Sequence, residues 1–154
     1  MGNGALKKIK KLLFACNYCV SFHPLSDETD PTHYPLFDEA VKKMLSVAFI
    51  PNDSAISPIS FAESLKPDFQ KTAFIFIPGR RFDSAGARQG RGNGWYDRFL
   101  SAVPKKWIRI GVTNEKYFSL APLFRNKWDE PMDWVAYEKN GIWTLYETKA
   151  REDI

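Results

Sequence analysis

The segment from residue 78 to residue 98 combines glycine, arginine and acidic residues in a pattern suited to binding an anion. Three glycines alternate between residues 90 and 94, and a backbone without Cβ atoms can take positive φ angles and approach a ligand closely. Successive N–H groups can then point into one concavity, to which a following helix adds its positive end. Arg88 and Arg91 can contribute charge and forked hydrogen bonds to phosphate oxygens. The segment therefore predicts a phosphate site, and a flexible loop with solvated arginines is the alternative.

Two familiar phosphate-binding motifs are excluded by the same residues. No Gly-Lys-Ser/Thr closes the segment, so it is not a Walker A loop. Trp95 stands where a dinucleotide fingerprint has its third glycine. A Gly-x-Gly-x-Gly run followed by an aromatic residue and Tyr-Asp-Arg is a more specific pattern than either partial match.

A strand and a helix are predicted on either side of this segment. Residues 72–77 are apolar on both faces, which is typical of a central parallel strand. Residues 95–103 carry one apolar stripe at helical spacing and end at Pro104. The glycines and arginines are thus expected in a loop between the carboxyl end of a strand and the start of a helix.

The rest of the chain alternates between strand-like and helix-like patterns. The predicted strands are 12–22, 47–50, 107–112, 135–137 and 142–146, the last two flanking Asn140-Gly141, a strong hairpin signal. Apolar residues recur at helical spacing from Pro35 to Met44, whereas residues 23–33 and 52–71 are expected to be mostly loop. This alternation predicts an α/β fold with a mainly parallel sheet.

Composition and charge limit the broad class of protein. The 154 residues suit a single domain, expected over 1–154, and 44% apolar with 26% charged residues excludes a disordered or coiled-coil chain. The net charge of +4 suits an anionic partner such as a nucleotide, a polyglutamylated ligand or a nucleic acid, without selecting among them. No run approaches the ~20 apolar residues that span a bilayer, so we expect no membrane partner and a cytoplasmic location. Residues 1–11 are interpreted as a basic segment that could be mobile.

The two cysteines, Cys16 and Cys19, have the spacing of a redox pair. An activated thiolate needs a helix start or a positive neighbour, and the surrounding apolar run is read as a buried strand with no helix start after it. Buried, reduced thiols are therefore favoured over a redox or metal site.

Residues 77–98 follow the pattern hydrophobic-Pro-Gly-x-x-Phe-Asp-x-x-Gly-x-Arg-x-Gly-x-Gly-x-Gly-x-Tyr-Asp-Arg. This resembles the signature of the 5-formyltetrahydrofolate cyclo-ligase (5,10-methenyltetrahydrofolate synthetase) family. The likeness extends upstream to residues 22–28, an aromatic-x-Pro-x-x-x-Glu element, and downstream to 110–112 and 129–138, where Asp-x-x-Met-Asp-x-Val fits. It covers roughly residues 12–140.

The resemblance implies a fold, a reaction and a set of residues. The fold would be a three-layer α/β/α, Rossmann-like arrangement of the cyclo-ligase and NagB-RpiA-CoA transferase kind. The reaction would be ATP-dependent closure of 5-formyltetrahydrofolate to 5,10-methenyltetrahydrofolate with Mg²⁺, in which the γ-phosphoryl group passes to the formyl oxygen, N10 attacks and phosphate leaves. The catalytic residues would be Arg88, Arg91 and Tyr96, and Mg²⁺ would be held by Asp97 and Asp133. ATP would be bound by Gly90, Arg91, Gly92, Asn93, Gly94, Trp95, Tyr96 and Asp97, and the folate by Phe22, Glu28, Trp95 and Tyr96.

Some positions depart from the family pattern. Members usually begin with an extra helix whose basic residues touch ATP, and no clear counterpart is seen before Phe22. Arg80 and Arg81 replace small or apolar residues.

Two alternative functions stay open beside the cyclo-ligase. One is a relative without this activity that binds a nucleotide or another small anionic ligand. The other is an RNA-binding module that uses arginines and aromatics, but +4 is weak for that role, so no nucleic acid partner is expected. A monomer or small homo-oligomer acting on a reduced folate and a nucleotide is the favoured interpretation.

Overall fold

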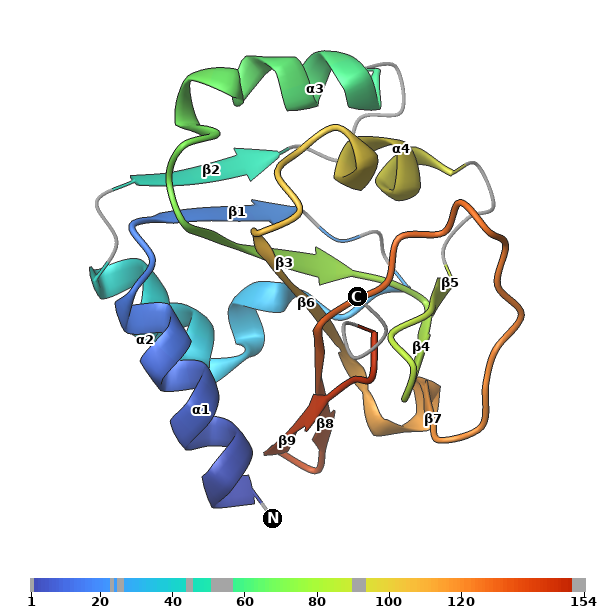
Figure 1. The fold of residues 1–154 in the computed structure, drawn as a ribbon. Coiled ribbons are helices and arrows are strands. Elements are labelled where there is room, and N and C mark those ends of the chain that lie inside the picture. Colours follow the sequence, from blue (N-terminus) through green and yellow to red (C-terminus); the bar gives the residue numbers. More distant parts are fainter. Residues whose placement is uncertain are drawn as a thin grey trace.

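A computed structural model describes residues 2–22, 24, 27–43, 46–50, 57–89 and 94–150. Within these residues, six strands form a sheet of order β2-β1-β3-β6-β8-β9 (Figure 1). Every neighbouring pair is parallel except β8 and β9. The strands of this sheet are β1 (Tyr18–Phe22), β2 (Ser46–Ile50), β3 (Ala73–Pro78), β6 (Ile108–Asn114), β8 (Trp134–Lys139) and β9 (Ile142–Glu147). The prediction of a mainly parallel sheet is confirmed.

Helices cover both faces of the sheet, which gives the expected three layers (Figure 1). One face carries α1 (Gly2–Phe14) and α2 (Pro35–Lys43), and the other carries α3 (Pro58–Ser64) and α4 (Trp95–Ser101). Strand β3 shows why both faces need cover, since its six residues are all buried. Successive side chains of a strand point to opposite faces, so Phe74 and Phe76 pack toward α1 and α2, whereas Ile75 and Ile77 pack toward α3 and α4.

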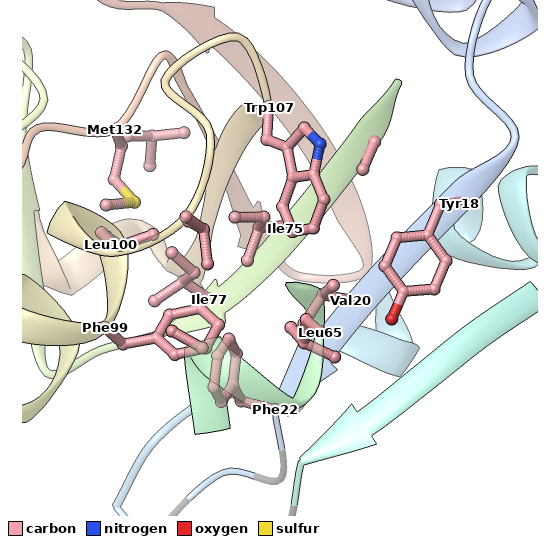
Figure 2. Packing of buried hydrophobic residues seen from close by; sticks show 14 of the residues in the cluster. Tyr18, Val20, Phe22, Leu65, Ile75, Ile77, Phe99, Leu100, Trp107 and Met132 are labelled. Carbon is pink, nitrogen blue, oxygen red and sulfur yellow. The ribbon is translucent and has the colours of Figure 1, made fainter. Parts of the chain in front are cut away.

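The core under α3 and α4 combines apolar strand residues with several large aromatic side chains (Figure 2). Trp107 is fully buried beside Tyr18 and donates its indole N–H to the carbonyl of Lys71. The ring of Phe22 ends this core near α4, where it meets Phe99 edge-on. The site described below begins at this end of the core.

Helix α1 corrects two expectations about the start of the chain. Residues 12–14 belong to this helix, and the predicted strand 12–22 shrinks to Tyr18–Phe22. Residues 2–11, the basic segment, are helical, so a helix precedes Phe22 where the sequence showed no clear counterpart of the family's first helix. The helix buries Ile9 and Leu13 against the sheet, while Lys8 pairs with Glu147 on β9.

Helix α3 corrects the interpretation of residues 52–71 as mostly loop. Pro58 occupies the first turn of this helix, and the Ser57 side chain accepts a hydrogen bond from the backbone N–H of Ser60. A serine cap followed by proline is a common helix start. A short 3₁₀ helix, η2 (Lys66–Asp68), follows, and residues 51–56 lie outside the described residues.

The remaining predicted elements are found close to their expected bounds. Helices α2 and α4, strands β2, β3 and β6, and the β8–β9 hairpin are confirmed. Asn140 and Gly141 have φ angles of 51° and 80°, as a tight hairpin turn requires. Two further 3₁₀ helices are η1 (Pro31–His33) and η3 (Glu115–Tyr117).

A second, small sheet was not predicted. Its strands are β4 (Arg81–Asp83), β5 (Arg88–Gln89) and β7 (Phe118–Ser119), in the order β5-β4-β7. The sheet is fixed to the core by Phe82, which is fully buried. A Cβ at Gly79 would lie 2.8 Å from the Phe82 ring, and one at Gly111 would overlap that ring, so both positions need glycine.

Both cysteines are free and buried, as the favoured interpretation predicted. Burial raises the pKa of Cys16 to about 11 and that of Cys19 to about 12. Both thiols are therefore protonated at neutral pH and poorly reactive. None of the helices in the described part of the chain has the length and apolar character needed to cross a membrane.

Candidate active site

Parallel strands bring the candidate residues to one edge of the sheet. Strands β1 and β3 end at Phe22 and Pro78, and they are parallel neighbours. Glu28 lies in the loop after β1, and Arg88 lies in the segment that connects β3 to α4. In open α/β sheets, ligands bind outside the carboxyl ends of the strands. The fold thus places Phe22, Glu28 and Arg88 where such sheets carry their sites.

The centre of the site is a buried contact between Glu28 and Arg88. Their side chains are 2% and 12% exposed, and Arg88 Nη2 lies 3.7 Å from Glu28 Oε2. Arg88 also donates from Nε to the carbonyl of Pro78 at 2.9 Å. Its guanidinium lies 4.0 Å from the centre of the Tyr96 ring, in a cation–π arrangement. The guanidinium is therefore held in one orientation by three different partners.

The electrostatics of this cluster follow from its burial. Burial lowers the pKa of Arg88, and the proximity of Tyr96, Glu28 and Asp97 opposes that shift. A guanidinium nevertheless keeps its charge in proteins. Burial raises the pKa of Tyr96, with Arg88 opposing, so the phenol is neutral at physiological pH. The cluster offers a fixed cation, a phenol hydroxyl and a carboxylate within a small space.

An aromatic wall stands beside the charged cluster. Phe22 meets Trp95, Tyr96 and Phe99 edge-on, with ring centres 4.9 to 5.9 Å apart. Trp95 stacks on Phe99 at 5.7 Å and touches Phe61 of α3. Trp95 and Tyr96 stay partly exposed. Such a wall can bind the flat face of a heterocycle, while the nearby carboxylate accepts hydrogen bonds from its N–H groups.

Asp83 orders the loops that carry this site. It is 1% exposed, and its Oδ1 accepts hydrogen bonds from the N–H groups of Ala85 and Ala87 at 2.9 and 2.8 Å. Its Oδ2 accepts a 2.7 Å bond from the N–H of Leu123, 40 residues further along the chain. Asp83 thereby holds both the turn that leads into Arg88 and the loop that follows β7.

The carboxylate beside Asp97 belongs to Asp129. Asp97 accepts a 2.8 Å hydrogen bond from the N–H of Glu130. Burial raises the pKa of Asp97, the hydrogen bond from Glu130 opposes this, and the charge of Asp129 raises the pKa further. Two carboxylates that disfavour each other's charge can share a divalent cation, which relieves their repulsion.

Asp133 has different surroundings from Asp97. It is 9% exposed, and its Oδ2 accepts a 2.8 Å hydrogen bond from the backbone N–H of Arg109. Asp133 directly precedes β8, at the amino end of that strand. In the part of the chain that the structure describes, no three His, Cys, Asp or Glu residues form a metal-binding group. A metal role for Asp133 stays a prediction.

The structure brings together Phe22, Glu28, Arg88, Trp95, Tyr96 and Asp97 from the predicted set. Gly94 has a φ angle of 69° directly before α4, the positive angle expected from the glycine-rich segment. Gly90, Arg91, Gly92 and Asn93 lie outside the described residues.

Asp83 and Asp129 are the functional candidates that the sequence reasoning did not assign. Both belong to the matched motifs, Phe-Asp and Asp-Glu-Pro-Met-Asp. Their positions within the family motifs could therefore have marked both residues as candidates. It could not show which of Asp129 and Asp133 lies beside Asp97, because that contact joins distant parts of the chain.

Comparisons with known proteins identify the family and the fold of this chain. The model of the 5-formyltetrahydrofolate cyclo-ligase family matches residues 53–138, more than half of the chain. A curated 5-formyltetrahydrofolate cyclo-ligase of Mycoplasma genitalium is 38% identical over 61 residues, which are 40% of this chain and 36% of the relative. The chain is thus aligned to about a third of the length of that relative.

A solved structure, described as a 5,10-methenyltetrahydrofolate synthetase from Mycoplasma pneumoniae, has the same fold. It superimposes with a TM-score of 0.55 and 19% sequence identity, over 85% of this chain and 82% of the other. With the signature from Pro78 to Arg98 and the cluster that it positions, the family match places this chain in the 5-formyltetrahydrofolate cyclo-ligase family.

Proposed function

We propose that this chain catalyses the ATP-dependent closure of 5-formyltetrahydrofolate to 5,10-methenyltetrahydrofolate. The observation that carries the proposal is the Glu28–Arg88–Tyr96 cluster, which stands beside an aromatic wall at the carboxyl edge of the sheet. Family membership supplies the reaction class, and the cluster supplies groups that this reaction needs.

The folate would bind with its ring system against the aromatic wall. Glu28 is a buried carboxylate that contacts Arg88, Arg88 packs on the Tyr96 ring, and Tyr96 contacts Phe22. The oxygens of Glu28 can accept hydrogen bonds from ring N–H donors. Arg88 fixes the position of Glu28 and is itself fixed by Pro78. The formyl-bearing nitrogen would then face the guanidinium and the phenol of Tyr96.

The chemistry would proceed in two steps on the bound folate. First, the formyl oxygen attacks the γ-phosphorus of ATP, the bond to the bridging oxygen breaks and ADP leaves. Second, N10 attacks the activated formyl carbon and a C–N bond forms. N10 gives up its proton, and the former formyl oxygen departs within inorganic phosphate, which can carry that proton away. Phosphoryl transfer depends mainly on positioning and on neutralising charge. The rigidly held cation of Arg88 would supply that charge, and Arg91 would supply more.

The paired carboxylates of Asp97 and Asp129 fit a magnesium ion. Mg²⁺ usually binds one or two protein carboxylates together with phosphate oxygens and water, and the mutual repulsion of this pair favours a cation. When bound, the ion would neutralise charge on the phosphates. Asp133 was predicted as the second ligand, and exchanging Asp129 or Asp133 for asparagine separates the two assignments.

An absorbance assay tests the proposal directly. The purified chain, mixed with 5-formyltetrahydrofolate, ATP and Mg²⁺, should produce the absorption band of the methenyl product. Omission of ATP or addition of a chelator should abolish the band. A folded sample that yields no product at high enzyme concentration would refute the proposed reaction.

A nucleotide-binding relative without this activity is the second candidate. This candidate stays open because only 36% of the curated relative is aligned with this chain. Calorimetry distinguishes the two functions, since binding of ATP without binding of the folate would favour this candidate. A cytoplasmic location, a monomeric or small oligomeric state and the absence of nucleic acid partners stay predictions.

A further inference from the structure

A basic cleft of about 640 Å³ lies beside the small sheet, apart from the cluster described above. Its lining residues come from the segments that follow β1, β3 and β6: Asp27, Arg80, Arg81, Gln89, Lys116 and Tyr117. Three of them are cationic and one is anionic. A cavity with this balance of charge favours an anionic ligand.

The three cationic side chains of the cleft differ in the contacts that they make within the protein. Arg80 pairs with Asp27 at 3.2 Å, which ties the loop after β1 to the loop after β3. Arg81 is exposed and Lys116 lies over the Tyr117 ring, with Nζ 5.0 Å from the ring centre. The Arg80–Asp27 pair thus shapes the wall, and Arg81 with Lys116 gives the cleft its excess positive charge.

The cleft adjoins the candidate active site across strand β5. Arg81 and Gln89 are paired across β4 and β5, and both line the cleft. Side chains alternate along a strand, so Gln89 faces the cleft while its neighbour Arg88 faces Glu28 and Tyr96. Likewise, Asp27 lines the cleft, whereas its neighbour Glu28 contacts Arg88 in the cluster. Since β5 is an edge strand, one elongated ligand can reach both sides of it.

We propose that this cleft binds the carboxylates of the glutamate part of the folate, with Arg81 and Lys116 as the recognising cations. The inference rests on the proposed function and extends it to substrate recognition. The ring system of the folate is assigned to the aromatic wall, and the phosphates are assigned to the glycine-rich segment and the acidic pair. The glutamate end, which carries two carboxylates, is the anionic part of the substrates that these sites leave unassigned. Arg81 is well suited to it, because a guanidinium binds a carboxylate through two parallel hydrogen bonds.

The test compares two ligands on four proteins by calorimetry. The ligands are 5-formyltetrahydrofolate and its 5-formyltetrahydropteroate analogue, which lacks the glutamate. The proteins are the unmodified chain, Arg81→Gln, Lys116→Gln and the control Lys66→Gln, which removes an exposed positive charge from η2, outside the cleft. All three substituted side chains are exposed, and circular dichroism verifies that each variant is folded.

The unmodified chain should bind the glutamate-bearing ligand more tightly than the analogue. Arg81→Gln and Lys116→Gln should each weaken that binding by about three- to five-fold, as expected for a partly exposed ion pair. Neither should change the affinity for the analogue or for ATP, and Lys66→Gln should change none of the three. Equal affinity of the unmodified chain for both folates would overturn the inference, and so would a loss of ATP affinity in the two cleft variants. If the unmodified chain binds neither folate, the proposed function fails and the inference fails with it.

Discussion

The substitution Asp83→Asn probes the link between the loops and the site. The Asp83 carboxylate is buried and accepts three backbone hydrogen bonds, two at Oδ1 and one at Oδ2. Asparagine has almost the same shape and keeps one carbonyl oxygen, which can serve Ala85 and Ala87. Its NH₂ group would replace Oδ2 and point a donor at the N–H of Leu123. The variant therefore loses one charge-assisted bond and leaves a buried donor without an acceptor.

These losses set the size of the expected effect. A hydrogen bond to a charged group contributes about 1.5–3 kcal/mol, and a buried unsatisfied donor costs about 1–3 kcal/mol. Because local relaxation makes the two effects overlap, we expect the free energy of unfolding to fall by about 2–4 kcal/mol. For a chain of this length, the melting temperature should fall by about 5–15 °C. Turnover should fall as well, because the turn that leads into Arg88 loses an anchor.

Thermal unfolding followed by circular dichroism measures this change. Glu63→Gln is the matched control, since it removes a carboxylate charge from an exposed position of α3 and should change stability by less than about 0.5 kcal/mol. If Asp83→Asn has the same melting temperature as the unmodified chain, the three hydrogen bonds do not hold the loops as described.

Three further predictions concern other parts of the molecule. Cys16 and Cys19, with pKa values raised to about 11 and 12, should not react with a colorimetric thiol reagent at neutral pH until the chain is unfolded, and rapid labelling of the native protein would contradict their burial. Gly111→Ala should destabilise the fold by about 1–3 kcal/mol, because its methyl group would overlap a buried ring. Gly4→Ala, with open space around it in α1, should instead stabilise the fold by up to about 1 kcal/mol, and denaturant titration should show opposite signs for the two. Asp97 has a raised pKa in the folded state, so the fold binds its proton more readily than the unfolded chain and loses stability as pH rises through that pKa. Asp97→Asn should therefore raise the melting temperature by about 2–4 °C at neutral pH while abolishing turnover, and a lower melting temperature would contradict the assigned repulsion.

Local patterns in the sequence were sufficient for most of the main sheet. Strand β3 is apolar on both faces because it lies between β1 and β6 under helices on each side. Asn140 and Gly141 predict the hairpin because few other residues adopt two successive positive φ angles. Each of these signals depends on a few adjacent residues.

The sequence of helix α1 has apolar residues at helical spacing, but the apolar run at its end favoured a strand. Ile9 and Leu13 lie four residues apart and are buried on one face of the helix. The apolar run from residue 12 to residue 16 favoured a strand, whereas tertiary packing decides such short apolar runs. The start of α3 was marked by Ser57 and Pro58, a cap signal that is weak when the helix has only seven residues.

The parts of the site that could not be predicted depend on contacts between distant segments. Asp97 meets Asp129 and Glu130 only once the chain has folded, and Asp83 reaches Leu123 across 40 residues. The small sheet pairs β4 with β7 in the same way. The family pattern named most of the residues of the site, but it could not show which carboxylates lie together.

Recognition of the folate ring is assigned to Glu28, which is held by Arg88 beside Tyr96. Glu28→Gln removes the acceptor charge while keeping the side-chain shape, and Glu63→Gln serves as its control. Calorimetry should show that Glu28→Gln binds 5-formyltetrahydrofolate at least about ten-fold more weakly than the unmodified chain does. Its affinity for ATP should be unchanged. Glu63→Gln should bind both ligands as the unmodified chain does. If Glu28→Gln binds the folate as tightly as the unmodified chain does, Glu28 does not recognise the folate ring.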